Sequence, residues 1–378
     1  MLNLGSASRL LPGFRIESGM TDKIRVVACT MILKQIHLTN FRNFEKNDFR
    51  FSPYLTLIVG ENARGKTSLL EAVFTSVYGT GFRETREIEL IRWDVGDNLV
   101  ESHYEEHDQE SFFQVRMQKS SETTVRKTYY VNKTGKSSHQ YRGMQTQAVL
   151  FAPEQIQIIT GSPSRRRRYF DEVISAVDRD YKKKIRYYEN ALRKRNKILE
   201  HYEDELKLFE ELKFWDSYLI EHGAYISNKR ASYIKYLNTH PSVNGKNFSI
   251  TYEQNLFSHE RLNEVKKREY RLRRTLIGPQ KDDFVFRLHF PQEKNVGLYG
   301  SRSEQRMAIF WLKLNELSYF ELHSKIKPLL LLDDIFSELD EHNRELVMGM
   351  IKEHQTIATT TEEEIKDIAE MPEELIRL

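Results

Sequence analysis

The sequence has very little cysteine and no long apolar run. Cys29 is the only cysteine among 378 residues, which excludes internal disulfides and cysteine-based zinc sites and favours a reducing cytosol. No segment approaches the roughly 18 consecutive apolar residues that a membrane-spanning helix needs. The net charge is also small, +3 at pH 7, so any surface for nucleic acid must come from local clusters of basic residues.

The distribution of glycine and of apolar residues divides the chain. Residues 1–30 lack the periodic pattern that begins at Met31 and carry no convincing secretory signal, so we expect an extension outside the fold, with Met31 as an alternative start. Residues 164 to about 236 contain almost no glycine and have apolar residues at helical spacing. This pattern predicts an inserted, mainly helical lobe over residues 164–274. Residues 31–163 and 275–378 are then the two halves of one discontinuous α/β domain.

Residues 54–74, YLTLIVGENARGKTSLLEAVF, combine an apolar strand, a glycine-bounded loop and an amphipathic helix. The loop matches GxxxxGK[ST], in which backbone N–H groups at a helix N-terminus cradle phosphates. A glycine turn that caps an ordinary helix is the alternative. Lys66 is expected to act in catalysis at the β- and γ-phosphates, and the Thr67 hydroxyl to bind Mg²⁺. The predicted nucleotide-binding residues are Gly60, Glu61, Asn62, Ala63, Arg64, Gly65, Lys66, Thr67 and Ser68.

Residues 327–340, KPLLLLDDIFSELD, are typical of a buried parallel strand that delivers acids to its carboxyl end. Ligands of open α/β sheets bind at that end. Asp333 is therefore expected to hold Mg²⁺, and Asp334 to orient or deprotonate the attacking water. The alternative is an apolar strand stopped by a solvated acidic turn. ATP and Mg²⁺ are the expected cofactors.

Residues 299–317, YGSRSEQRMAIFWLKLNEL, predict a capped helix. Ser301 and Glu304 form an S-x-x-E capping box. The predicted buried face of the helix consists of Met307, Phe310, Trp311, Leu314 and Leu317. A helix N-terminus with a serine and nearby arginines can also bind a γ-phosphate presented by another subunit. The residues alone leave these two interpretations open.

Alternating apolar and polar residues predict strands around the phosphate loop. ILKQIHLTNF and FEKNDFRFS predict an antiparallel hairpin that turns near Arg42 and Asn43. Arg42 either approaches the phosphates or lies on the surface at a strand end. FFQVRM and KTYYVN predict further strands of a β-rich flank, and AVLFAPEQIQII at 148–159 predicts a strand broken by Pro153.

Seven motifs occur in order along the chain: NFRNF (40–44), GENARGKTSLLEA (60–72), FAPEQIQIITGSPSRRRRYFD (151–171), GPQKDDF (278–284), SRSEQR (301–306), LLLLDDIFSELD (329–340) and QTIATTT (355–361). Together they resemble the RecF family, bacterial DNA replication and repair ATPases with an ABC-type head similar to those of SMC proteins. The resemblance runs from Met31 to near the C-terminus. It implies an ABC-type P-loop NTPase head, with a mixed sheet and a β flank, that carries the inserted helical lobe.

The resemblance also implies a homodimer that closes on two ATP molecules. Ser301, Glu304 and Arg306 correspond to the signature motif, which would contact ATP bound by the partner subunit. Residues 337–340 resemble the loop that crosses the same interface.

Some positions depart from the family pattern. Ala63 and Ser303 stand where the family usually has glycine, and Glu304 stands where it usually has glutamine. The changes near Ser301 are expected to weaken dimerisation and hydrolysis more than ATP binding, because they add bulk and a like charge beside a phosphate.

Basic residues crowd one end of the helical lobe. The predicted DNA contacts are Arg165, Arg166, Arg167, Arg168, Lys182, Lys183, Lys184, Arg193 and Lys194. Such density predicts salt-dependent and largely sequence-independent binding of phosphates. A solvated charged face with interleaved acids such as Asp171 and Glu172 explains the same pattern, and the family resemblance favours DNA. Arg165 to Arg168 also lie at a helix start beside a motif that can serve the nucleotide domain instead.

The resemblance implies an ATP-gated homodimer with weak ATPase activity in the bacterial cytoplasm, associated with the nucleoid and not with a membrane. The resemblance implies that it binds single-stranded and gapped duplex DNA. It also implies that RecO and RecR are its partners when recombinase is loaded on single strands during repair and the SOS response. An alternative is an interaction module that ATP ties together without significant hydrolysis. A membrane transporter's nucleotide-binding subunit is disfavoured by the basic lobe and by Thr359 to Thr361, which replace the switch histidine.

Overall fold

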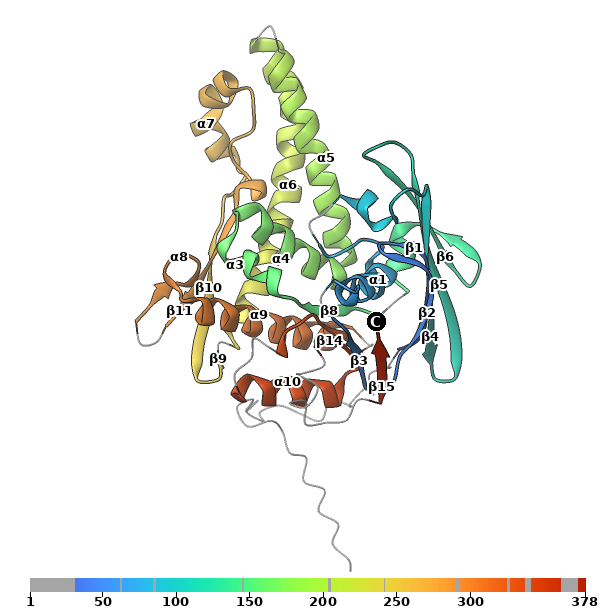
Figure 1. Ribbon diagram of the computed structural model, residues 1–378. Helices are drawn as coiled ribbons and strands as arrows, with labels where there is room; N and C mark the ends of the chain where they lie inside the picture. The colour runs from blue at the N-terminus through green and yellow to red at the C-terminus, as the bar shows by residue number, and fades with distance from the viewer. Residues whose placement is uncertain are drawn as a thin grey trace, which may run out of the picture. The chain divides into compact units, whose positions relative to one another are not determined.

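A computed structural model describes most of the chain (Figure 1). The described residues are 31–61, 63–83, 86–144, 146–202, 205–240, 242–289, 292–324, 327–336, 341–361 and 373–378. They divide into two compact units, one built from the residues up to Pro153 together with Leu317–Leu378, the other from Glu154–Glu316. The insertion predicted over 164–274 lies within the second unit. The predictions for residues 1–30, Asn62 and residues 337–340 fall outside the described residues.

The first unit contains a six-stranded antiparallel sheet in the order β2-β1-β4-β5-β6-β7. Its strands are β1 Ile32–Phe41, β2 Phe44–Arg50, β4 Asp97–Glu106, β5 Gln109–Lys119, β6 Val125–Val131 and β7 Thr134–Lys136. Phe41 pairs with Phe44, which confirms the predicted hairpin with its turn at Arg42 and Asn43. Asn132 and Lys133 both have positive φ, the geometry of a tight hairpin turn between β6 and β7.

The same unit contains a five-stranded parallel sheet in the order β15-β3-β14-β13-β8. Its strands are β3 Leu55–Val59, β8 Ala148–Phe151, β13 Leu329–Leu332, β14 Thr356–Thr360 and β15 Glu374–Arg377. All four leucines of β13 are buried, which confirms the predicted buried parallel strand. Because β14 lies between β3 and β13, the segments that follow β3 and β13 leave the same edge of the sheet, one strand apart.

The helix α1 (Lys66–Tyr78) lies between these two sheets (Figure 1). Its apolar residues Leu69, Leu70, Val73 and Val77 are buried, whereas Phe74 is only partly buried. They share one core with residues of β1, β4 and β5 and with residues of β3, β13 and β14. The helix ends at Gly79, whose left-handed conformation suits glycine. The other helices of this unit are α2 Ser138–Arg142, the short 3₁₀ helix η1 Glu87–Leu90, and α10 Glu341–Glu353.

The predicted strand at 148–159 is wrong beyond Phe151. After β8 the chain forms a 3₁₀ turn, η2 (Pro153–Ile156), and a short helix, α3 (Gln157–Thr160). Pro153 has no N–H for a ladder hydrogen bond, and its fixed φ suits the start of a helical turn. Ile156 and Ile159 are three residues apart, so a helical turn directs both to one side, where Ile159 is buried.

The second unit contains the predicted helices of the insertion. The long helices α5 and α6 pack side by side as a hairpin (Figure 1). The helices are α4 Pro163–Val177, α5 Arg179–His201, α6 Glu205–Asn238, α7 His259–Leu272, η3 Pro279–Lys281, α8 Val296–Tyr299 and α9 Arg302–His323, the last of which continues past Glu316. Asp178 starts α5 by accepting a 2.8 Å hydrogen bond from the Tyr181 amide. No helix among the described residues is long and apolar enough to cross a membrane.

A small antiparallel sheet, in the order β12-β11-β10-β9, completes this unit. Its strands are β9 Ser242–Val243, β10 Lys246–Glu253, β11 Asp283–Leu288 and β12 Lys294–Asn295. The longer pair, β10 and β11, is antiparallel, with Phe248 opposite Leu288 and Glu253 opposite Asp283.

Buried ion pairs connect α5, α6 and α7. The Arg195 side chain is only 2% exposed and lies 2.6 Å from Asp216 Oδ1 and 2.8 Å from Glu269 Oε2. Its third nitrogen donates to Thr275 Oγ1 at 2.7 Å. A buried charge of this kind is tolerated only with such complete pairing. Arg195 therefore belongs to the interior of the helical unit, although it lies in a basic run of the sequence.

Candidate functional site

The phosphate loop turns at Gly65, whose left-handed backbone conformation favours glycine. Gly65 has φ of 109°, and a Cβ placed there would lie 2.5 Å from Asn43 Nδ2. Asn43, in the β1–β2 turn, also donates to the Arg64 carbonyl at 3.2 Å. The hairpin and the loop therefore support each other, and a side chain at position 65 would clash as well as strain the backbone.

The loop leads directly into α1, which begins at Lys66. Gly65 provides no side-chain cap to this helix, so the amides of its first turn remain directed toward the loop, where they can donate to an anion. Lys66 Nζ donates to the carbonyls of Gly60 at 2.6 Å and Glu61 at 3.3 Å, which places the ammonium inside the loop. Glu61 and Arg64, in contrast, form an exposed ion pair with each other at 3.1 Å.

The loop and the acidic strand end meet at Asp333. Thr67 Oγ1 donates to Asp333 Oδ1 at 3.0 Å, and Thr359 Oγ1 donates to the same oxygen at 2.9 Å. The two residues that the sequence assigns to Mg²⁺ therefore lie in direct contact. A hydroxyl and one carboxylate fit this ion, which usually takes few protein oxygens and completes its shell with phosphate oxygens and water.

Asp334 has a different environment from Asp333. Asp333 is 3% exposed, whereas Asp334 is exposed and has φ of 50°. The backbone turns into the left-handed region directly after the buried acid, so the two consecutive carboxylates point to different surroundings. This division agrees with separate roles, one at the ion and one at the attacking water.

A buried glutamate, Glu71, and Arg83 lie beside the loop and were missed by the sequence reasoning, whereas Arg42, which also contacts Glu71, was considered there as a residue that approaches the phosphates. The Glu71 side chain has no exposed area and lies 2.9 Å from Arg42 Nε and 3.1 Å from Arg83 Nε. Arg83 also donates to Ser68 Oγ at 3.1 Å. Arg42 is 13% exposed, which does not fit the surface alternative. Glu71 could have been noticed as an acid on the apolar face of α1, but no local pattern indicates Arg83.

The predicted capping box at Ser301 is present. Glu304 Oε2 accepts from the Ser301 amide at 2.7 Å, and the Glu304 amide donates to Ser301 Oγ at 3.3 Å. Lys294 Nζ lies 2.8 Å from Glu304 Oε1. The hydrogen bond from Lys294, followed by the one from the Ser301 amide, lowers the pKa of Glu304 to about 2. Glu304 is thus ionised and paired, while Ser301, Ser303 and Arg306 are exposed.

The predicted DNA contacts on α4 fall into two groups. Arg166 binds Asp283 through Nε at 2.7 Å and Nη2 at 3.0 Å, and Arg167 donates to the Asp282 carbonyl at 2.8 Å. Burial lowers the pKa of Arg167. These contacts favour a structural role for both side chains. Arg168, in contrast, lies on the surface and pairs with Glu172 at 2.9 Å, and Arg165 is partly buried.

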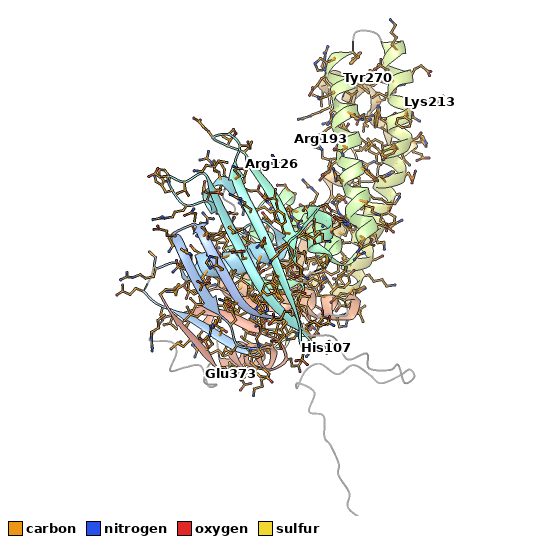
Figure 2. All side chains as sticks on the ribbon, turned by 90° about the vertical axis from the view of Figure 1, so that its right-hand side faces the viewer. His107, Arg126, Arg193, Lys213, Tyr270 and Glu373 are labelled. Atoms are coloured by element: carbon orange, nitrogen blue, oxygen red, sulfur yellow. The ribbon has the colours of Figure 1, made fainter. Side chains whose placement is uncertain are left out.

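The predicted contacts on α5 belong to one helix of the α5–α6 hairpin, on which Figure 2 labels Arg193. Lys183, Arg193 and Lys194 are exposed, and Lys182 and Lys184 are partly exposed. Lys184 pairs with Glu221 at 3.5 Å, and Lys194 lies over the ring of Trp215 at 4.9 Å. DNA binding by the basic residues of α4 and α5 stays a prediction. The α5 residues are the better candidates, because more of them are exposed than on α4.

Comparison with solved structures first defines the class of protein. The chain is similar to the Smc head domain from Pyrococcus furiosus that is bound to the C-terminal domain of ScpA, with a TM-score of 0.52 and 16% identity over 92% of this chain and 93% of that chain. At this identity the likeness concerns the fold. Together with the parallel sheet and the phosphate loop, it defines an α/β head of the ABC ATPase type.

Closer relatives then define the family. Residues 32–377 match the family model described as RecF/RecN/SMC N terminal domain. A DNA replication and repair protein RecF from Agathobacter rectalis is 30% identical over 342 residues, 88% of this chain and 92% of that protein. The protein of the same name from Bacillus cereus strain B4264 is 31% identical over 353 residues, with 88% and 92% covered.

A solved structure of the recombination mediator protein RecF-ATP in the RecFOR pathway superposes with a TM-score of 0.79 at 29% identity, over 88% of this chain and 92% of that chain. The chain belongs to the RecF family, as its motifs predict.

Ala63 offers a test of strain in the phosphate loop. Its φ of 67° lies in the left-handed region, where a residue with a Cβ is disfavoured by about 1–2 kcal/mol. Replacing Ala63 by glycine also gives the unfolded chain more conformational freedom, which reduces the gain in the free energy of unfolding by about 0.4–1 kcal/mol. We therefore expect Ala63→Gly to raise the free energy of unfolding by about 0.5–1 kcal/mol, measured by denaturant titration. Ala72→Gly, inside α1, is the control and should lower it by at least about 1 kcal/mol, because Ala72 is also buried in the core; equal losses in both variants would contradict the strain.

The Glu304 pair predicts a defined pH dependence. The pKa of Glu304 is lower in the folded protein than its ordinary value of 4.5, so the pair stabilises the folded state fully above that value and is lost as pH falls toward 2. Glu304→Gln keeps a capping side chain but removes the titrating group. The difference in melting temperature between wild type and Glu304→Gln should therefore shrink as pH falls from about 6 to about 3. A difference that is constant over this range would contradict the pairing.

Proposed function

We propose that this chain binds ATP and acts in DNA replication and repair as an ATP-gated homodimer. The observation that carries the proposal is the 3.0 Å contact between Thr67 of the phosphate loop and Asp333 at the end of β13. This contact brings together two motifs that are 266 positions apart in the sequence. The names of the relatives, and the ATP-bound RecF structure, support the same role.

In the proposed mechanism, the loop amides and Lys66 bind the phosphates, and the amides at the start of α1 add a positive dipole end. Mg²⁺, held by Thr67 and Asp333, would neutralise charge on the phosphate oxygens. Asp334 would orient the attacking water from its exposed position beside the buried acid. Arg42 and Arg83 place two cations around one carboxylate next to the loop, which leaves a net positive charge near the anionic ligand.

The signature segment would bind ATP held by the partner subunit. Ser301 is exposed at the N-terminus of the 22-residue helix α9, a suitable donor position for a γ-phosphate. Glu304 would repel that phosphate if it were unpaired. Because Lys294 lies 2.8 Å from its carboxylate, we infer that the repulsion is largely offset and that ATP-dependent dimerisation is retained.

DNA would bind to the basic side chains of α5, above all Lys183, Arg193 and Lys194. Gapped duplex and single-stranded DNA are the proposed ligands, with slow ATP hydrolysis releasing them. RecO and RecR are the proposed partners for loading recombinase, in line with the RecFOR pathway named for the ATP-bound relative, and the proposed location is the bacterial cytoplasm.

Dimerisation and DNA retention test this proposal together. Light scattering and filter retention with gapped duplex DNA should show a dimer that retains DNA with ATP but not with ADP. Lys66→Met removes a charge-assisted contact worth about 1.5–3 kcal/mol, so ATP should bind at least about tenfold more weakly and both signals should disappear at limiting ATP. A monomer that binds DNA equally in all conditions would instead identify α5 as a constitutive DNA site and refute the ATP gate.

A second candidate function is favoured by the altered signature residues Ser303 and Glu304. In this alternative, ATP ties the dimer together and is not significantly hydrolysed. Comparing steady-state ATP turnover of the wild type with that of Asp334→Asn separates the two. The ATP-gated cycle predicts a turnover that falls by about 100-fold or more in the variant, since general-base assistance is typically worth 10²–10⁴. Equal and negligible rates in both proteins would favour the interaction module.

A further inference from the structure

Thr359 occupies a central position at the edge of the sheet where the proposed site lies. It belongs to β14, which pairs with β3 on one side and with β13 on the other. Its backbone is in register with Ile58, one residue before the end of β3. The phosphate loop begins after β3, and the two aspartates follow β13, so Thr359 stands between both halves of the site.

The hydroxyl of Thr359 contacts both consecutive acids. The Asp334 backbone amide donates to Thr359 Oγ1 at 2.8 Å, and Thr359 Oγ1 lies 2.9 Å from Asp333 Oδ1. An amide can only donate, so the hydroxyl accepts from Asp334 and directs its single hydrogen to the Asp333 carboxylate. Thr359 has no exposed area, so water does not compete for these two bonds.

These two bonds act on the parts of the acids that matter for the proposed chemistry. The bond to Asp333 holds one carboxylate oxygen on the side that Thr67 also contacts at 3.0 Å. The bond from the Asp334 amide fixes the backbone at the point where φ becomes 50°, and so sets the direction in which the Asp334 side chain leaves the sheet.

We propose that Thr359 is the positioning residue that orients Asp333 toward the metal ion and Asp334 toward the attacking water. This inference rests on the proposed ATP site and adds a residue to it. Thr359 itself touches neither ATP nor the ion in this proposal. It acts as outer-shell hydrogen-bond partners of metal ligands generally do, by fixing the orientation of a ligand that it contacts.

The chain provides a matched control on the same strand. Thr356 is also buried, and its hydroxyl donates to the His354 carbonyl at 3.0 Å, away from both acids. Replacing either threonine by valine keeps the shape of the side chain and removes one hydroxyl from β14. A merely structural role of Thr359 would therefore give the two variants the same properties.

The test measures metal dependence as well as turnover. Binding of a fluorescent ATP analogue is titrated with Mg²⁺ and with EDTA, and Mn²⁺ binding to the ATP complex is followed by electron paramagnetic resonance. In Thr359→Val, the Mg²⁺-dependent gain in ATP affinity, the Mn²⁺ affinity and the turnover number should each fall about tenfold or more, with binding in EDTA unchanged. Thr359→Ser, which keeps the hydroxyl, should restore all three, and Thr356→Val should match the wild type.

The outcomes separate this inference from the proposed function. If the wild type shows Mg²⁺-dependent ATP binding and Thr359→Val behaves like Thr356→Val, the positioning role is refuted while the ATP site stands. If the wild type gains no ATP affinity from Mg²⁺, the metal site fails and the inference fails with it. Should valine at 359 prevent folding, Thr359→Ala takes its place, and a normal Mn²⁺ affinity in that variant would equally overturn the proposal.

Discussion

One carboxylate oxygen, Asp333 Oδ1, is the point on which the site depends. It accepts hydrogen bonds from Thr67 at the start of α1 and from Thr359 on β14. The Asp333 amide donates to the Phe151 carbonyl of β8 at 2.8 Å. The start of α1 after β3, the end of β8, the residue that follows β13 and the strand β14 are therefore held together around a buried acid. Burial strengthens these bonds, because the interior has a low dielectric constant and few competing water molecules.

The local patterns of the sequence predicted the elements of this site well, because each depends on near neighbours. The GxxxxGK[ST] loop, the leucine strand and the capping box at Ser301 all formed as expected. The contacts of Thr359 and Arg83 were not predictable in the same way. Thr359 contacts Asp334 and Asp333, which lie 25 and 26 positions away in the sequence. Arg83 reaches Glu71 because the chain turns back after α1. The order of the strands in the sheet reveals the neighbours of Thr359, and the turn after α1 reveals the neighbour of Arg83.

The basic residues show the limit of reading charge from sequence. Arg166, Arg195 and Lys183 belong to similar basic runs, yet their environments differ. Arg166 and Arg195 are paired with acids from distant segments, and Arg195 is buried. Lys183 is exposed and pairs with Asp180 at 3.8 Å on the same helix. One run of basic residues can therefore contain both interior ion pairs and surface charge. The acids that pair with the interior members lie far away in the sequence.

The order of strands in the parallel sheet has a consequence for how the chain folds during its synthesis on the ribosome. β3 pairs with β14 and β15, which come after the second unit in the sequence, whereas Glu154–Glu316 is one continuous segment with its own internal contacts. Domains generally fold as units as the chain emerges, and pairings between distant segments form slowly. The second unit, Glu154–Glu316, can therefore fold first, whereas the phosphate loop can reach its folded environment only after β14 has been synthesised. The nascent chain would thus be unable to form the complete nucleotide site until β14 has been synthesised.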